Sequence, residues 1–321
     1  MNRKVFIVLA VILGLSVALV LLLLGCSQEV DVGEIVNVFS GKDCQSPVLV
    51  SVSTASSSVV RIEFSEPVRI YGSSFSPFTA RADGKFVYVT MNSSLPPGQS
   101  SSIGGRVKDY SGNTTGFSVE VWGHNPLIPP IVINEFTTKG TERSPDRTEL
   151  LVKANGNING MVLYCGIPDD NDAKVVFGDL NVKENDLIVV WWTEKLPDNV
   201  LEYGIGTINI CASTNSGPSS NNGTLVLCNT PSLGAGIMDA VVYSNFSASH
   251  DGYGTRGAKE RAQWVLTSGF WEGDAVDSTT STATRSMSRV LEGRDSNCCK
   301  DWYVTVTGGS TFGLPNDSEA Y

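Results

Sequence analysis

The sequence predicts an all-β protein with two β-sandwich domains. Short runs of alternating or continuous apolar residues recur along the chain, and they are rich in β-branched and aromatic side chains. Gly, Ser, Asn and Pro separate these runs at short intervals, as turns separate the strands of a sandwich. A chain of 321 residues is too long for one small sandwich and suits two modest domains.

The first element is a membrane-inserting segment. Arg3 and Lys4 precede it, and residues 5–24 carry no charge and a single polar side chain, that of Ser16. A run of about 20 apolar residues can span a bilayer as a helix, so a permanent signal anchor is one interpretation. The cysteine at the end of the run, Cys26, favours another.

The four residues Leu23-Leu24-Gly25-Cys26 resemble the lipobox of bacterial lipoproteins. This resemblance implies that residues 1–25 are a signal peptide, that it is cleaved before Cys26, and that a diacylglycerol is attached to the Cys26 sulfur. We therefore expect the chain to contact the bilayer through Cys26 and to lie in the bacterial cell envelope. Ser27, rather than an aspartate, follows the cysteine, which favours the outer membrane by the sorting rule of enteric bacteria.

Residues 26–45 are predicted to be a polar tether, and residues 46–122 the first sandwich. Four strand-like runs fall in this domain: "VLVSVS" from Val48, "VVRIEFS" from Val59, "KFVYVTM" from Lys85 and "FSVEVW" from Phe117. The stretches "VVRIEFSEPV" and "RVKDYSGN" resemble the Ig-like modules of bacterial surface proteins. This resemblance implies an Ig-like sandwich. Three prolines in "GHNPLIPP", residues 123–130, mark a linker after it.

The last domain is predicted to span residues 131–321. Its motifs "INEF" (133–136), "GTLVL" (223–227), "DAVVY" (239–243) and "GLPN" (313–316) resemble those of the lamin-tail domain in sequence and order. That resemblance implies an Ig-type sandwich that serves as a binding or scaffold module. Two stretches depart from the family pattern, residues 202–220 and 247–264, and we expect both to be long loops.

The charge and the cysteine content limit which partners and which cellular compartment we expect. The net charge is −10, and Lys and Arg form no cluster, so nucleic acid is not an expected partner. Six cysteines remain if Cys26 carries lipid, enough for up to three disulfides in an oxidising envelope. The sequence does not show which of them pair. The six residues are Cys44, Cys165, Cys211, Cys228, Cys298 and Cys299. Because no CxxC pair occurs, zinc is not expected.

Three groups of polar residues are candidate sites. Asp169, Asp170 and Asp172 form an oxygen-rich turn that is a weak calcium candidate, although such turns are commonly just solvated. His250 and Asp251 lie in a Gly-rich loop and could act as the base and orienting group of a hydrolase, although no nucleophile elbow accompanies them.

The third group is a pair of strand carboxylates, Glu135 and Glu149. Paired carboxylates can perform acid and base catalysis, but solvent-facing positions on strands, with Lys153 or Arg147 as neighbours, are the favoured explanation. The sequence therefore predicts no catalytic residue, no metal site and no cofactor.

Two adjacent tryptophans, Trp191 and Trp192, end the apolar run "LIVVWW". Neighbouring side chains on a strand point to opposite faces, so both indoles cannot lie in one core. One of them is predicted to be covered by a loop or by the other domain, or else to bind a protein or a sugar ring.

These features together favour a non-catalytic envelope lipoprotein that presents sandwich surfaces to a protein or glycan partner. A hydrolytic or metal-dependent enzyme, or an enzyme accessory, with its site in the long loops of the second domain is the alternative. A structural spacer is a third interpretation. The sequence leaves the partner and the oligomeric state open.

Overall fold

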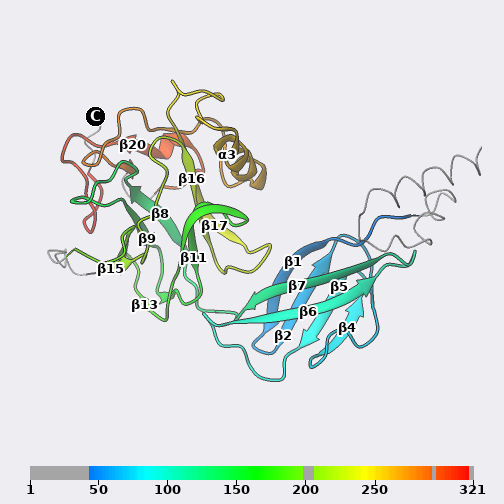
Figure 1. Ribbon diagram of the computed structural model, residues 1–321. Helices are drawn as coiled ribbons and strands as arrows, with labels where there is room; N and C mark the ends of the chain where they lie inside the picture. Colours follow the sequence, from blue (N-terminus) through cyan, green and yellow to red (C-terminus); the bar gives the residue numbers. More distant parts are fainter. Residues whose placement is uncertain (1–42, 198–205, 291–293, 318–321) are drawn as a thin grey trace, which may run out of the picture.

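The computed structural model describes residues 43–197, 206–290 and 294–317. Residues 1–25, Cys26 and most of the tether lie outside this part of the chain. The prediction of an all-β sandwich protein is confirmed, because strands make up nearly all of the regular structure (Figure 1). Within the described residues, no helix is long and apolar enough to cross a membrane.

The N-terminal sandwich packs two antiparallel sheets, of order β1-β2-β5-β4 and β3-β6-β7. Alternation along the strands builds its core: Val60, Ile62 and Phe64 of β2 point inward, and the residues between them do not. Its strands are β1 (Leu49–Ser56), β2 (Val59–Phe64), β3 (Arg69–Ile70), β4 (Thr79–Asp83), β5 (Phe86–Thr90), β6 (Ser100–Lys108) and β7 (Thr114–Trp122).

The C-terminal sandwich packs a five-stranded sheet, β12-β11-β16-β17-β18, against a six-stranded sheet, β15-β14-β9-β8-β19-β20, with a small β10-β13 pair beside them. Its strands are β8 (Ile131–Phe136), β9 (Arg147–Val152), β10 (Gly156–Asn157), β11 (Val162–Ile167), β12 (Asp170–Val176), β13 (Asn181–Val182), β14 (Leu187–Trp191), β15 (Thr207–Cys211), β16 (Gly223–Cys228), β17 (Ile237–Ser244), β18 (Val276–Asp277), β19 (Met287–Arg289) and β20 (Trp302–Val304). A 3-10 turn, Cys299–Asp301, precedes β20.

The central strands of this sandwich are buried on both faces. Every residue of β8, β11 and β14 is buried. Strands buried on both sides need a further layer outside the two sheets, and the chain supplies one on each side. Helix α3 (Arg256–Ser268) packs on β16 and β11 (Figure 1). On the other sheet, Phe312 of the C-terminal segment packs on Val189 and Trp191 of β14.

Both stretches predicted to be long loops contain regular structure, so that prediction is wrong in part. Residues 207–211 form β15, which pairs in parallel with β14. Residues 256–268 form α3, which begins at an N-cap, Thr255, and ends at Gly269 with φ 79°. Ala262 and Val265 bury the inner face of the helix.

The segment between the two sandwiches is hydrogen-bonded to the C-terminal sandwich. Strand β7 ends at Trp122 and β8 begins at Ile131, so no named strand lies in the Pro-rich stretch. The side chain of Asn125 in this stretch donates to the backbone oxygens of Asn157 and Asn159, at 2.8 Å and 3.0 Å. The linker therefore follows the surface of the C-terminal sandwich instead of running free.

The two sandwiches also touch directly through the loop between β16 and β17. The amide of Val52 in β1 donates to the carbonyl of Leu233 at 2.8 Å, and the Leu233 side chain packs on the core of the N-terminal sandwich. On the other side, the Asn159 side chain donates to the carbonyl of Pro97 at 3.0 Å. A Cβ added to Gly234 would lie 2.5 Å from that of Ser51, so only glycine permits this approach.

Replacing Leu233 by serine is expected to loosen this join. Loss of the partly buried leucine side chain removes about 1–2 kcal/mol of apolar burial from the contact. ¹⁵N relaxation should give one common rotational correlation time for both sandwiches in the parent chain and two shorter ones in L233S. Leu314, 47% exposed and not among the residues packed on that core, is the matched control. Unchanged relaxation in L233S would show that Leu233 does not hold the sandwiches together.

Candidate functional site

The acidic turn at residues 169–172 is fixed by an arginine from helix α3. Arg261 donates Nε and Nη2 to Asp170, at 2.8 Å and 2.7 Å, and Nη1 and Nη2 to Asp172, at 2.7 Å and 3.1 Å. These contacts lower the pKa of Asp170 below its ordinary value. Arg261 therefore occupies the carboxylates of Asp170 and Asp172 and joins α3 to β12, whereas Asp169 is exposed.

His250 and Asp251 lie in the loop that leads into α3, where both have positive φ. The Nδ1 atom of the His250 ring is 3.3 Å from the Ser249 hydroxyl and 3.2 Å from the carbonyl of Gly254. Asp251 instead pairs with Lys259 of the helix at 2.5 Å. The two side chains therefore have separate partners, and the arrangement expected of a base and its orienting carboxylate is not formed here.

Glu135 and Glu149 lie opposite each other on β8 and β9 and are both fully buried. The interpretation that they face solvent is therefore wrong. Burial, together with the neighbouring Glu135, raises the pKa of Glu149 to about 8. The pKa of Glu135 is also raised, again because the carboxylate is buried.

The C-terminal segment covers this carboxylate pair. The amide and hydroxyl of Thr311 both donate to Glu135 at 2.9 Å, and the amide of Gly313 donates to Glu149 at 2.6 Å. The hydroxyl of Ser286 also donates to Glu135. Asn316 then donates to the backbone oxygen of Arg289 at 2.6 Å. The pair is thus enclosed and held by hydrogen bonds that fix the end of the chain to β8 and β9.

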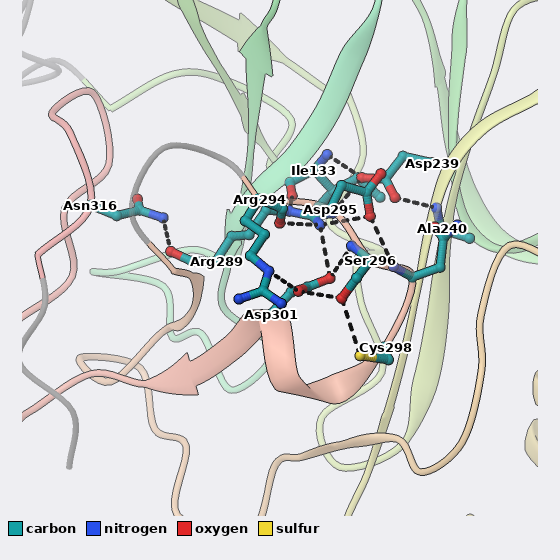
Figure 2. A network of polar contacts seen from close by, with 11 residues as sticks. Ile133, Asp239, Ala240, Arg289, Arg294, Asp295, Ser296, Cys298, Asp301 and Asn316 are labelled. Carbon is teal, nitrogen blue, oxygen red and sulfur yellow. Dashed lines mark hydrogen bonds and ion pairs between the residues drawn. The ribbon is translucent and has the colours of Figure 1, made fainter.

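A second buried polar network centres on Arg289 of β19 (Figure 2). Its guanidinium donates to Asp239 at 2.7 Å, to the carbonyl of Ile133 at 2.7 Å and to Asp295 at 3.0 Å. Asp239 is fully buried and also accepts from the amide of Ile133 at 2.6 Å. Nearby, Asp301 accepts both the amide and the hydroxyl of Ser296, at 2.5 Å and 2.7 Å. The network joins the two sheets to the loop before β20.

Trp191 and Trp192 point to opposite faces, as predicted. The Trp192 indole lies in the central core and donates Nε1 to the hydroxyl of Thr148 at 3.0 Å. The Trp191 indole lies on the outer face, 9% exposed, against Phe312 and Leu196. The chain itself therefore covers both rings, as the prediction of a covering loop expects, and the alternative of a ring that binds a partner gains no support.

A polar groove lies beside Trp192, at the edge of the C-terminal sandwich. Its volume is about 510 Å³, and its lining offers two carboxylates, an amide and two hydroxyls around the Trp192 residue: Thr141, Glu142, Asp146, Thr193 and Asn215. Burial raises the pKa of Asp146 to about 6. No sequence pattern predicts this groove, since the loops that form it are far apart along the chain.

Asp43, Glu66 and Asp109 form an acidic cluster in the N-terminal sandwich, with ligand oxygens within 4.8 Å of one another. The turn after β6 already occupies Asp109, which accepts from the amides of Gly112 and Asn113 at 2.5 Å and 2.8 Å. The Asn113 side chain also donates to it at 2.6 Å. The role of Asp109 in this cluster is therefore structural, since its carboxylate holds the turn after β6.

The expectation of disulfides is not met among the described cysteines, all six of which are free. Cys165 and Cys228 lie on neighbouring strands, but Cys165 is opposite Leu225 and Cys228 is opposite Val162. A displacement of three residues along the strands separates the two sulfurs by about 10 Å, too far for a bond. Burial raises the pKa of the Cys228 thiol to about 12.

Comparison with known proteins identifies one region of the chain. A family model described as TP_1001_2nd, protein second domain, matches residues 129–304. The matched region runs from the end of the Pro-rich linker through β20 and thus covers most of the C-terminal sandwich. No curated protein and no solved structure matches the chain. Because the family model covers more than half of the sequence, the chain belongs to the family of the TP_1001 second domain.

Proposed function

We propose that this protein is a bacterial envelope lipoprotein, anchored by lipid on Cys26, that binds a protein or glycan partner without catalysis. The proposal that the protein binds a partner rests on the polar groove beside Trp192. Carboxylates, amides and hydroxyls that line a groove are the groups that recognise the hydroxyls of a sugar. A glycan is therefore the favoured occupant.

The join between the sandwiches supports this role. A module tethered at its N-terminus presents its far domain in a fixed orientation when the two domains contact each other directly. The contacts of Leu233 and Asn159 restrict the motion of one sandwich against the other. The likeness to lamin-tail domains agrees with a binding or scaffold module, since Glu135 of "INEF" and Gly313 and Asn316 of "GLPN" take part in one structural network.

The enzymatic alternative draws less support from the same geometry. Its candidate carboxylates, Asp170 and Asp172, are held by Arg261, and Asp251 pairs with Lys259. These groups stabilise the loops around α3.

The binding proposal is tested by titrating the full chain with soluble fragments of envelope glycans while recording amide shifts by NMR. Residues that line the groove should shift, and N215A should weaken binding about fivefold because one hydrogen bond is lost. Asn92, an exposed asparagine on the N-terminal sandwich, provides the matched control N92A. Absence of shifts at the groove with every fragment would overturn the glycan assignment.

A further inference from the structure

A cavity of about 200 Å³ lies between the N-terminus of α3 and the outer face of the five-stranded sheet. Among the groups that line it are a hydroxyl from β16, the first turn of the helix, and an arginine already paired with acidic residues. These are Thr224, Gly257 with Ala258, and Arg261 with Asp172. The cavity is separate from the groove beside Trp192, with which it shares no lining residue.

Thr224 is the residue that points to a ligand. It is 2% exposed, and its hydroxyl has no hydrogen-bond partner in the described part of the chain. A buried hydroxyl without a partner is costly, so a group that pairs with it gains free energy.

The strand register shows that this hydroxyl faces α3. Cys165 of β11 lies opposite Leu225 on one side and opposite Ala173 on the other, which places these three side chains on one face. By alternation, Thr224 and Asp172 lie on the other face. Arg261 reaches Asp172 from the helix, so α3 covers the face that carries Thr224.

The first turn of α3 offers donors to the same cavity. The helix has 13 residues, and the cap Thr255 accepts from the amide of Ala258 at 3.1 Å. The preceding amides, of Arg256 and Gly257, lack acceptors within the helix by its geometry. The first turn has no acidic residue to offset the partial positive charge of the helix N-terminus.

Charge selects the ligand class. Asp170 and Asp172 would repel an anion, but the guanidinium of Arg261 is bound to both of them, which offsets much of that repulsion. A single negative charge therefore suits the cavity better than two. A Cβ added to Gly257 would meet nothing within 4 Å, so the space beside this residue is open.

We propose that this cavity binds a monoanionic carboxylate group, which accepts hydrogen bonds from the Thr224 hydroxyl and from the amides at the N-terminus of α3. This site is independent of the proposed glycan groove. The carboxylate belongs to a small molecule or to a chain end, since the space admits no more than a short group beyond it.

The test is an NMR titration of the full chain with sodium acetate, and separately with inorganic phosphate, at constant ionic strength. Acetate should shift the amides of Thr224 and Gly257 saturably, whereas phosphate should bind more weakly. T224V should weaken acetate binding at least tenfold and, without acetate, should unfold at a higher temperature than the parent because its buried polar atom is gone. T224S should bind like the parent.

The exposed threonine Thr282 supplies the control T282V, which should behave like the parent in both measurements. Equal acetate affinity in T224V and the parent, or no shift near α3, would overturn the site. Phosphate binding tighter than acetate would overturn the choice of a carboxylate. N215A should leave acetate binding unchanged, so failure of the glycan groove and failure of this site are distinguishable.

Discussion

Replacing Arg289 by methionine is expected to lower the free energy of unfolding of the C-terminal sandwich by about 3–5 kcal/mol. Methionine fills similar space, but it leaves the buried carboxylate of Asp239 without its cation. Burial raises the pKa of Asp239 to about 6, and Arg289 opposes that rise. The variant also loses the bond to the carbonyl of Ile133 and the contact of the guanidinium with the Trp302 ring, 4.7 Å away. Denaturant unfolding measures the difference.

Two further variants identify the cause of that loss. R143M changes an exposed arginine in the same way and should alter stability by less than about 0.5 kcal/mol. Adding D239N to R289M removes the buried charge that lost its partner, so the double variant should be more stable than R289M alone. If R289M unfolds within about 1 kcal/mol of the parent, the Arg289 network does not support the fold.

Raising the pH from 5 to 9 is expected to lower the free energy of unfolding of the parent chain by about 3–5 kcal/mol more than that of E149Q. The folded-state pKa of Glu149 is about 8, above its ordinary value of 4.5, so the folded protein holds this proton more tightly than the unfolded chain does. The resulting stability is fully present below about pH 4.5 and is lost as the pH rises through about 8. Glutamine keeps the shape and removes the charge.

Urea unfolding at both pH values measures this difference. E184Q, at an exposed position before β14, should follow the parent at every pH. The amide of Gly313 opposes the rise in the pKa of Glu149, because its hydrogen bond favours the ionised carboxylate. Parallel loss of stability in the parent and E149Q would mean that Glu149 does not retain its proton.

The strands were predictable because their signal is local. Alternation in "VVRIEF" and the continuous apolar run "LIVVWW" each describe one segment and its burial, and β2 and β14 form there. Opposite orientation of Trp191 and Trp192 follows from the same two-residue period. What covers Trp191 was not predictable, since Phe312 lies far along the chain.

Helix α3 was missed although the sequence carries its signals. Thr255 and Gly269 are good caps, and "AKERAQ" between them is rich in helix formers. Glycines at 252, 254 and 257 dominated the interpretation of this stretch as a loop. They lie before the helix or in its first turn, where glycine does little to oppose helix formation.

The buried carboxylates could not be predicted from their surroundings in the sequence. An acidic residue on a strand is normally at a solvent-facing position, and Glu135 and Glu149 fit that pattern locally. Their partners Thr311 and Gly313 lie 176 and 164 residues away. Only the folded chain brings the C-terminal segment onto β8 and β9, so burial at these positions depends on tertiary structure.

Mass spectrometry of the intact protein extracted from cell membranes tests the proposed anchor most directly. We expect a chain that begins at Cys26 and carries the added mass of a diacylglycerol, and we expect C26S to remain unprocessed with residues 1–25 attached. A parent chain that begins at Met1, or one with an unmodified Cys26, would contradict the proposal that lipid on this cysteine holds the two joined sandwiches at an envelope membrane.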